Sequence, residues 1–353
     1  MSWGREGPKM ELSRLGAAVH LLSTLILGCT WDGLHVEKRQ STNGKVESTN
    51  DEVSRIRVTR QIPVTSSSFR AVMADSLSPP SGSAQDEAEI PLDAINLFPR
   101  KIGPRIFHLP GRGAILKVGR SVRMAEAEAM RFVSSRSSIP VPEVYEAYEK
   151  NGIGYIYMCK VEGLQLGETW SSLSYDKKAY IADQLRGYVT ELRDMRGDSY
   201  GALWNQPSAD IFFSHLCLKT HDNKQYGPFK SRAEYNQGLV EALTNSRPRG
   251  QLGESENSII AKISALTEDA KVFSHGDLHL DNILVDGNCK IMAIVDWGSA
   301  GFSIPGREYL EANLRARQPE WIKLLDDVFP EDAKAEYHIL KELDRALVLY
   351  SGF

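Results

Sequence analysis

The chain has 353 residues, 42% of them hydrophobic, and a formal net charge of −4 at pH 7. This length and apolar content favour one large domain, or one two-lobed domain with an extension. The mild acidity gives no reason to expect nucleic-acid binding. The four cysteines are far apart and lack CxxC spacing, which argues against a disulfide framework or a zinc site. A reducing, cytoplasmic compartment fits this cysteine usage best.

The first ninety residues differ in composition from the rest of the chain. Residues 15–29 are largely apolar and follow basic residues, as in a signal peptide. The stretch is shorter than the roughly 20 residues that a membrane-spanning helix needs. A targeting or membrane-associated segment and a short buried helix both stay open here, and membrane contact is the less favoured reading. Residues 31–89 are rich in Ser, Thr, Asn and charge, which predicts a mostly disordered segment with a linker at residues 66–83.

Residues 106–118 predict a β-hairpin, because two apolar runs flank a turn at residues 110–113. Lys117 lies on the second strand and shares one face with Ile115, since side chains alternate along a strand. A lysine on an otherwise apolar strand is expected to have an anionic partner. The alternative is an exposed lysine at the edge of the sheet.

A helix is predicted at residues 121–134, and its apolar face includes a carboxylate. The residues on that face are Glu126, Ala129, Met130 and Val133. A carboxylate on an apolar face is costly unless it is paired, so we expect Glu126 to bind Lys117. Glu128, two residues off this face, is the competing candidate. For either glutamate, an ordinary solvated charge is the alternative.

The next strand is predicted to start at residues 144–147, after two prolines that prevent the helix from continuing. Residues 154–160 form another apolar, β-rich run, which we interpret as an edge strand. A plain core strand is equally compatible with these residues.

Helical periodicity dominates the second half of the chain. An apolar stripe predicts a helix over residues 175–195. Ser231 and Glu234 resemble a capping box that opens a helix running through Leu243. Isoleucines and a leucine at helical spacing mark a third helix within residues 259–266.

The most informative segment is residues 272–298. Asp277 follows His275 and Gly276, and Asn282 comes five residues after Asp277. Asp296 then opens an Asp-Trp-Gly triplet. Together these residues make a pattern far more specific than any one of them alone.

A second hairpin is predicted between Asn282 and Asp296. Two apolar arms, residues 283–285 and 291–295, flank Asp-Gly-Asn at residues 286–288. These three residue types tolerate the positive φ of tight turns. Because a hairpin brings its open ends together, we expect Asn282 and Asp296 to emerge side by side. The alternative is a hairpin with polar residues at its ends and no further role.

Two oxygen ligands at the open end of the hairpin, with the Asp277 carboxylate as a third group upstream, suit Mg²⁺. Phosphoryl transfer needs in-line positioning, neutralised oxygens and a group that orients the attacking hydroxyl. We therefore expect Asp277 to accept or orient the hydroxyl proton. Asn282 and Asp296 would hold the metal against the nucleotide phosphates.

The segments HGDLHLDNILV (275–285) and IVDWGSAGF (294–302) resemble the aminoglycoside phosphotransferase family, and most closely its large fungal branch. That family shares its fold with choline kinase and eukaryotic protein kinases. The resemblance runs from about Pro91 to the end of the chain. It implies an α+β, two-lobed, protein-kinase-like fold with ATP in the cleft. The small β-rich amino-terminal lobe would span residues 91–160 and the larger, mainly helical lobe residues 161–353, after an extension at 1–90.

The resemblance also implies roles for residues in the first lobe. Lys117 would contact the α- and β-phosphates, held by Glu126 as in kinase folds. A glycine-rich GxGxxG loop is absent, and residues 98–103 are the candidate nucleotide loop, placed before the first strand. Arg100 or Lys101 would then lie near phosphate, with a plain surface turn as the alternative.

Residues 154–160 would lead into the hinge between the lobes. Backbone groups of the hinge would bind the adenine edge, and the residues expected to provide this nucleotide contact are Met158, Cys159 and Val161.

Two histidines complete the expected site. His275 is expected to bond backbone next to Asp296 and to fix the catalytic loop, in preference to acid–base catalysis. His279 stands where protein kinases have a lysine, which argues against a protein kinase. It would aid phosphate or metal binding, or stabilise the loop.

The expected activity is ATP- and Mg²⁺-dependent transfer of the γ-phosphoryl group to a hydroxyl of a small molecule, with GTP not excluded as donor. A catalytically weak pseudokinase or nucleotide-binding module is the alternative, because the glycine-rich loop is missing. The sequence does not identify the acceptor or the oligomeric state.

Overall fold

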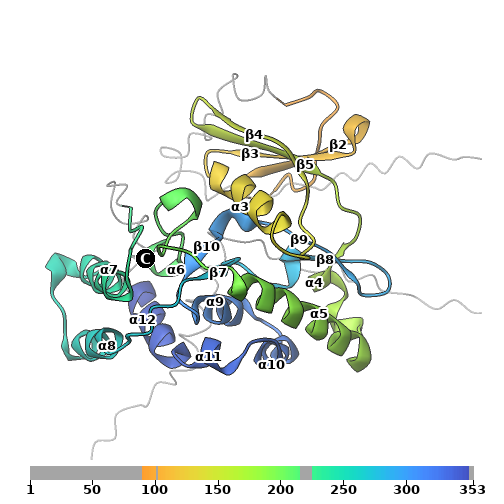
Figure 1. The fold of residues 1–353 in the computed structure, drawn as a ribbon. Helices are drawn as coiled ribbons and strands as arrows, with labels where there is room; N and C mark the ends of the chain where they lie inside the picture. Colours follow the sequence, from red (N-terminus) through yellow and green to blue (C-terminus); the bar gives the residue numbers. More distant parts are fainter. Residues whose placement is uncertain (1–89, 101, 215–224, 350–353) are drawn as a thin grey trace, which may run out of the picture. The chain divides into compact units, whose positions relative to one another are not determined.

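The structure is a computed structural model, and it describes residues 90–100, 102–214 and 225–349 (Figure 1). The chain divides into two units, Met1–Ile90 and Pro91–Phe353, and all the elements named below belong to the second. The predictions made for residues 15–29, for residues 31–89 and for Lys101 lie outside the described residues.

The amino-terminal lobe is an antiparallel sheet with the strand order β1–β2–β3–β5–β4, drawn at the top of Figure 1. Its strands are β1 (Ile95–Asn96), β2 (Arg105–Leu109), β3 (Ala114–Gly119), β4 (Val144–Lys150) and β5 (Ile153–Cys159). The predicted hairpin of β2 and β3 is confirmed, with Ile106 opposite Lys117. Its turn is a short 3₁₀ helix, η1 (Pro110–Arg112), and Gly113 closes it with a φ of 56° that suits glycine.

Two predictions for this sheet are wrong. Strand β5 is not an edge strand, because it lies between β3 and β4. A local apolar run does not encode which distant segments pair with it, so burial on both sides stayed undetermined. The loop at residues 98–103 does not precede the first strand either. It connects β1 to β2, and β1 was too short, at two residues, to give a sequence pattern.

Helix α3 (Met124–Ser134) lies directly below this sheet in Figure 1. It begins three residues later than predicted, because Arg123 is extended with φ −102° and ψ 142°. The predicted apolar face is confirmed, since its four residues are all buried: Glu126, Ala129, Met130 and Val133. The helix therefore presents one carboxylate to the interior beneath β3.

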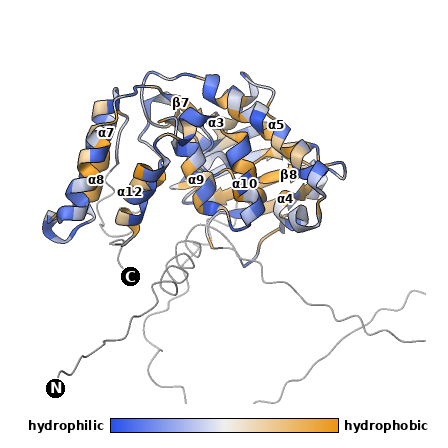
Figure 2. Cartoon of the chain, turned by 90° about the horizontal axis from the view of Figure 1, so that it is seen from below, coloured by the Kyte–Doolittle hydropathy of each residue, from blue (hydrophilic) through white to orange (hydrophobic). Residues whose placement is uncertain are grey.

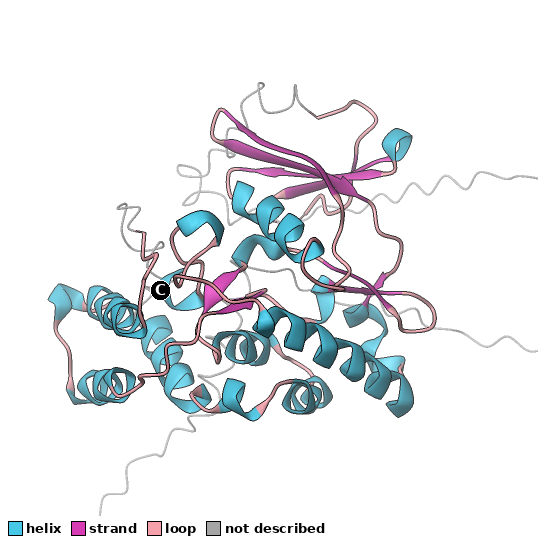
Figure 3. Cartoon of the chain, viewed as in Figure 1, coloured by secondary structure: helices cyan, strands magenta, loops and turns pink. Residues whose placement is uncertain are grey.

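The carboxy-terminal lobe is mainly helical (Figure 3). Its α-helices are α4 (Leu166–Thr169), α5 (Tyr175–Asp194), α6 (Ile211–Ser214), α7 (Arg232–Asn245), α8 (Glu254–Ser264), α9 (Arg307–Arg315), α10 (Pro319–Val328), α11 (Glu331–Lys334) and α12 (Tyr337–Leu349). Short 3₁₀ helices are η2 (Trp170–Ser172), η3 (Leu203–Asn205), η5 (Pro248–Gly250), η6 (Leu280–Asn282) and η7 (Trp297–Ser299). The strands are β6 (Leu164–Gln165), β7 (Val272–Ser274), β8 (Ile283–Val285), β9 (Ile291–Ile294) and β10 (Gly301–Ser303). The predicted α+β, two-lobed architecture is confirmed.

The three predicted helices of this lobe are present as α5, α7 and α8. The capping prediction for α7 is half right. The Ser231 hydroxyl accepts a hydrogen bond from the N–H of Glu234, as expected for an N-cap. The Glu234 carboxylate, however, accepts from the N–H of Lys230 and not from Ser231. Helix α8 ends at Ser264, two residues before the last residue of the predicted stripe.

Two buried apolar clusters hold this unit together. The first runs from the sheet and α3 through α5, the strands β7, β8 and β9, and α10, so it joins the two lobes. The second lies among α6, α7, α8 and α12. Figure 2, viewed from below, shows that the helices of the lower lobe carry both hydrophobic and hydrophilic residues. Among the helices of the described part, none combines the length and apolar character needed to cross a bilayer.

Candidate active site

The candidate catalytic loop starts where strand β7 ends. This strand is fully buried and pairs antiparallel with β10. His275 follows it and has no exposed surface. Its Nε2 donates to the Val295 carbonyl at 3.0 Å, and its Nδ1 accepts from the N–H of Asp277 at 3.1 Å. The predicted contact between His275 and the backbone next to Asp296 is therefore present.

Burial lowers the pKa of His275 to about 3, so the imidazole is neutral at physiological pH. The two hydrogen bonds assign the tautomer with the proton on Nε2. A neutral ring in this position supports the loop, and it is a poor acid or base for the reaction.

Gly276 has the left-handed backbone that glycine favours, with a φ of 78°. A Cβ at this position would overlap Arg307 Nη2 and lie 2.6 Å from the Ser299 carbonyl. The N–H of Gly276 donates to Glu308 Oε2 at 3.0 Å. The loop is thus held from behind by two consecutive residues of helix α9.

The Asp277 carboxylate is mostly enclosed, with 17% of its side chain exposed. Arg315 Nε, at the end of α9, lies 2.6 Å from Oδ1 and forms an ion pair with it. The Arg315 N–H is not aligned for a hydrogen bond, so the contact is electrostatic. Burial raises the pKa of Asp277 to about 7, although Arg315 opposes this rise. A carboxylate with a pKa near 7 suits a general base.

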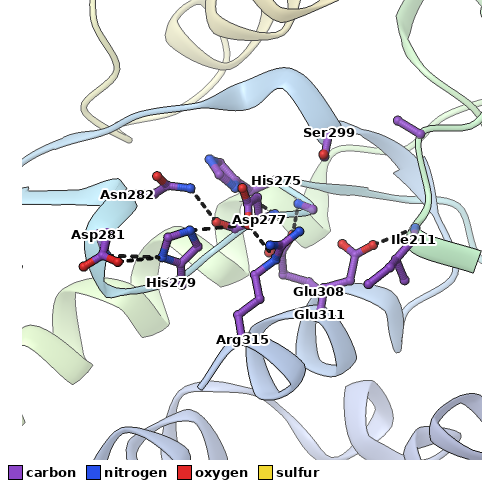
Figure 4. A network of polar contacts seen from close by, with 12 residues as sticks. Ile211, His275, Asp277, His279, Asp281, Asn282, Ser299, Glu308, Glu311 and Arg315 are labelled. Carbon is purple, nitrogen blue, oxygen red and sulfur yellow. Dashed lines mark hydrogen bonds and ion pairs between the residues drawn. The ribbon is translucent and has the colours of Figure 1, made fainter. Parts of the chain in front are cut away.

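Asn282 and Asp296 stand at the open end of the β8–β9 hairpin, as predicted. Residue Ile283 pairs with Ile294, and the N–H of Val295 donates to the Asn282 carbonyl at 2.9 Å. The Asn282 amide nitrogen donates to the Asp277 carbonyl at 2.9 Å, as drawn in Figure 4. This bond ties Asn282 to the catalytic loop and assigns its amide oxygen to the opposite side.

The turn of this hairpin works differently from the prediction. The residue with positive φ is Cys289, at 65°, and not one of residues 286–288. Asp286 fixes the turn with its side chain, because Oδ1 accepts from the N–H groups of Asn288 and Lys290, each at 2.9 Å. Side-chain bonding by Asp286 therefore replaces the expected backbone conformation.

Asp296 has left-handed backbone angles, φ 68° and ψ 60°, which aspartate tolerates better than most residues. The next residue, Trp297, is fully buried, and its Nε1 donates to the Ile294 carbonyl at 2.9 Å. The Trp297 ring also lies edge-on to His275, with centroids 4.5 Å apart. Anchoring by Trp297 leaves the Asp296 side chain 38% exposed, with Oδ1 2.7 Å from Lys117 Nζ.

Lys117 connects the upper lobe to this segment. Its Nζ lies 2.7 Å from Glu126 Oε1, 2.9 Å from Glu126 Oε2 and 2.7 Å from Asp296 Oδ1. The predicted ion pair of Lys117 with Glu126 is present, whereas Glu128 pairs with Arg131 on the surface. Burial alone would lower the pKa of Lys117, but the two carboxylates outweigh it and raise the pKa. Lys117 therefore stays charged.

Two of the three expected hinge residues, Met158 and Cys159, lie within the sheet. Met158 lies within β5 and pairs with Ile115 on one side and Val144 on the other. The N–H of Cys159 donates to the Glu143 carbonyl at 2.8 Å. The contact of Met158, Cys159 and Val161 with the adenine edge stays a prediction.

His279 lies beside Asp277. Its Nδ1 accepts from the N–H of Asp281 at 3.3 Å, and its Nε2 lies 3.5 Å from Asp277 Oδ1 (Figure 4). The first contact makes His279 the cap of η6. The structure thus shows a loop-stabilising contact for His279, one of the two roles expected for it.

Sequence reasoning missed a buried charged network behind the loop. Its members are Asp210, Tyr235, Ser303, Arg307, Glu308 and Glu311. Arg307 lies 2.8 Å from Asp210 and 3.1 Å from Glu311, and donates to the Ser299 carbonyl at 2.7 Å. Arg315 was missed as well. The sole signal was Arg307, Glu311 and Arg315 at four-residue helical spacing, which any solvated helix also shows.

The donor set at the hairpin mouth fits magnesium. Mg²⁺ is commonly held by one or two carboxylates together with phosphate oxygens and water. Asp296 offers a partly exposed carboxylate, and the bond from the Asn282 amide nitrogen leaves the amide oxygen as the remaining donor. In the described ranges, no group of three or more His, Cys, Asp or Glu side chains is arranged to hold a metal ion.

Comparison with protein families decides the assignment. Residues 106–347 match the model of the phosphotransferase enzyme family, which covers more than half of the chain. The chain belongs to this family. The matched range includes Lys117, Glu126 and the whole segment from His275 to Asp296. The predicted resemblance to the aminoglycoside phosphotransferases is confirmed, and the chain is a phosphotransferase with a kinase-like fold.

Two curated relatives are subtelomeric hrmA-associated cluster proteins of Aspergillus fumigatus. One is 33% identical over 90 residues, which is 24% of this chain and 18% of the relative. The other is 33% identical over 112 residues, which is 31% of this chain and 21% of the relative. The matches span about a fifth of each relative's length. Both organisms are fungal, and assignment to a fungal branch of the family stays a prediction.

Solved structures of phosphotransferases are similar to this chain at low sequence identity. An ADP-bound aminoglycoside phosphotransferase is 16% identical, covers 70% of this chain and 90% of its own, and superposes with a TM-score of 0.43. A macrolide 2′-phosphotransferase type I is 14% identical, covers 74% and 82%, and has a TM-score of 0.42.

Proposed function

We propose that this phosphotransferase is an ATP- and Mg²⁺-dependent small-molecule kinase that phosphorylates a hydroxyl group. The observation that carries the proposal is the contact of Lys117 Nζ with both Glu126 and Asp296, each at 2.7 Å. It joins a cation of the upper lobe to the acidic residue at the hairpin mouth of the lower lobe. This contact places the positive charge of Lys117 next to Asp296, a candidate metal ligand, as phosphate binding requires.

Each residue of the site then has a separate role. Asp277 accepts the proton of the acceptor hydroxyl as its oxygen attacks the γ-phosphorus. Lys117 neutralises phosphate oxygens, and Glu126 holds it in place. His275 keeps the backbone of Asp277 fixed, because its Nδ1 accepts from that residue's N–H at 3.1 Å. His279 orients the base from the other side, 3.5 Å away.

The nucleotide and metal follow from the same arrangement. Asn282 and Asp296 would hold Mg²⁺, which neutralises charge on the phosphates when it is bound. The carbonyl of Cys159 and the N–H of Val161 would bind the adenine edge, since the N–H of Cys159 is already bonded in the sheet. The loop between β1 and β2, including Arg100, would cover the phosphates. We extend this proposal to a cytoplasmic enzyme with lobes at residues 91–160 and 161–353.

The test is calorimetric ATP·Mg²⁺ binding together with the rate of ADP release, on wild type and Asp277→Ala. We expect wild type to bind ATP·Mg²⁺. Asp277→Ala should keep most of that binding and lose roughly 10²–10⁴-fold in rate. Asp296→Ala should instead weaken binding of the metal–nucleotide complex.

Two outcomes contradict the proposal in different ways. Undetectable binding of ATP·Mg²⁺ by folded wild-type protein would exclude a kinase. Normal binding without release of ADP, in the presence of many hydroxylated metabolites, would favour a nucleotide-binding module. Asp277, Asn282 and Asp296 are all present, which favours a working kinase over a nucleotide-binding module.

A further inference from the structure

Arg315 is the last residue of helix α9, and it reaches the carboxylate that we assign as the base. Its Nε lies 2.6 Å from Asp277 Oδ1, and the two residues face each other in Figure 4. The Arg315 side chain is 23% exposed, so part of it is open to solvent beside the base. The carboxyl end of a helix is a favourable place for a cation.

The contact is incomplete as a hydrogen bond. Both Arg315 Nε and Asp277 Oδ1 are buried, yet neither has an aligned hydrogen-bond partner in the described part of the chain. There, the ion pair with Asp277 is also the one direct polar contact of Arg315. A guanidinium group has five N–H donors in a flat fork, so most of them remain for a ligand.

The contact leaves Arg315 able to bind a second anion. Because its Nε is not aligned for a hydrogen bond with Asp277 Oδ1, the guanidinium group can turn toward an acceptor bound beside Asp277. Only a negatively charged group on the acceptor competes well with a carboxylate for a guanidinium.

The neighbouring acids do not favour a cationic acceptor. Glu311 is buried against Arg307 and accepts from the N–H of Ile211 at 3.0 Å. Glu308 is buried and accepts from the N–H of Gly276. Both carboxylates of α9 are therefore engaged inside the fold, and Arg315 is the charged side chain of this helix that reaches the base.

We propose that Arg315 is a specificity-determining residue that binds an oxyanion group of the acceptor, next to the hydroxyl that is phosphorylated. This inference rests on the proposed kinase function and names its substrate class as hydroxylated acids. The acceptor oxygen forms a bond to the γ-phosphorus while the bond from that phosphorus to the bridging oxygen breaks. ADP leaves with the bonding electrons, Asp277 takes the hydroxyl proton, and the product is the phosphate ester of the acid.

The experiment compares small hydroxylated acceptors that differ in charge. The probes are glycerate and glycerol phosphate as two kinds of anion, glycerol as the neutral compound, and serinol as the cation. The readouts are kcat/KM from ADP release with saturating ATP·Mg²⁺, and calorimetric binding of each probe to protein loaded with ADP·Mg²⁺. The proteins are wild type, Arg315→Met, Arg315→Lys and Arg317→Met, an exposed arginine two residues further on.

We expect wild type to bind and phosphorylate at least one of the two anions in preference to glycerol and serinol. Arg315→Met should reduce binding and kcat/KM for that anion by roughly 10–100-fold, the range for a hydrogen bond to a charged group. Calorimetric binding of glycerol, which has no anionic group for Arg315 to bind, should not weaken. Arg315→Lys should fall between wild type and Arg315→Met, because it keeps the charge without the fork. Arg317→Met should match wild type.

The inference fails if neither anion binds to the nucleotide-loaded protein, if serinol is the preferred acceptor, or if Arg315→Met keeps the preference for the anion. It also fails if Arg317→Met loses as much as Arg315→Met. In each of these cases ATP·Mg²⁺ still binds. Failure of the kinase proposal is distinguishable, because that protein does not bind ATP·Mg²⁺ at all.

Discussion

Two buried charged clusters of this protein resemble each other in composition and differ in access. Between the two lobes, Lys117 lies between Glu126 and Asp296, and the Asp296 side chain is 38% exposed. Behind the catalytic loop, Arg307 lies between Asp210 and Glu311, and all three side chains are about 1% exposed. Each cluster is one cation between two carboxylates. The open cluster is suited to a ligand, whereas the closed one is suited to fixing the loop.

The closed cluster predicts the largest effect on stability. Arg307→Met leaves Asp210 and Glu311 buried without their cation, and it removes the bond to the Ser299 carbonyl. Breaking a buried pair in this way costs about 3–5 kcal/mol. We expect that loss in the free energy of unfolding, measured by urea denaturation.

A surface pair provides the control for Arg307→Met. Lys262 and Glu342 are 2.6 Å apart and both are more than 40% exposed, so Lys262→Met should cost less than about 1 kcal/mol. If the two variants lost the same free energy, the closed cluster would have no special structural role.

The open cluster should affect ligand affinity more than folding. Glu126→Gln keeps the shape of the side chain but removes the charge that holds Lys117. A lost outer partner of this kind weakens a site by roughly 10–100-fold. We expect that decrease in ATP·Mg²⁺ affinity by calorimetry, with a smaller stability loss than for Arg307→Met.

Glu128→Gln is the matched control, because Glu128 lies on the same helix and pairs with Arg131 at the surface. Its nucleotide affinity should equal that of wild type. A decrease for Glu128→Gln equal to that for Glu126→Gln would mean that the buried glutamate does not position Lys117.

His275 predicts a dependence of stability on pH. Burial lowers its pKa to about 3 in the folded state, against 6.5 in an exposed chain. The unfolded state therefore binds more protons below pH 6.5, so His275 contributes stability above that pH and loses it as pH falls toward 3. At pH 5 the loss amounts to roughly 2 kcal/mol. The charged groups that act on this ring are Asp296, His279 and Arg307.

His275→Gln lacks the titrating ring but keeps those three neighbours. Its free energy of unfolding should therefore fall less than that of wild type between pH 7 and pH 5, by roughly 2 kcal/mol. Urea denaturation at both pH values measures the difference. Parallel losses in the two proteins would show that the ring is not held neutral.

The smallest effect is expected at the start of helix α7, at a capping residue that belongs to neither cluster. The Ser231 hydroxyl accepts from the N–H of Glu234 at the start of α7. Ser231→Ala should cost about 1 kcal/mol of unfolding free energy, the usual value for an N-cap, with ATP·Mg²⁺ affinity unchanged. A change in affinity would indicate that α7 communicates with the cleft.

The sequence predicted those parts of the site that depend on local patterns. The β8–β9 hairpin is local, so the juxtaposition of Asn282 and Asp296 followed from its two arms. Helical and strand periodicities were enough to pair Lys117 with Glu126. The placement of β5 was wrong because strand order depends on pairing across the sheet, which no local run of residues records.

Contacts from distant helices were beyond sequence reasoning for the same reason. Arg307 and Arg315 are separated from the catalytic loop by the hairpin, β10 and the turn into α9. Nothing in their immediate neighbours distinguishes them from solvated helix charges. The roles of the expected site residues in catalysis remain predictions, while the contacts among them are those described above.

The backbone bond between the Val295 N–H and the Asn282 carbonyl has a practical consequence. It closes the hairpin at its open end, next to Asn282 and Asp296. The length of the tip can therefore change while this end stays closed. Gly287 and Asn288, at the tip, are exposed. A fluorescent reporter inserted between them would sit at the far end of the hairpin from this bond, and should leave the positions of Asn282 and Asp296 unchanged.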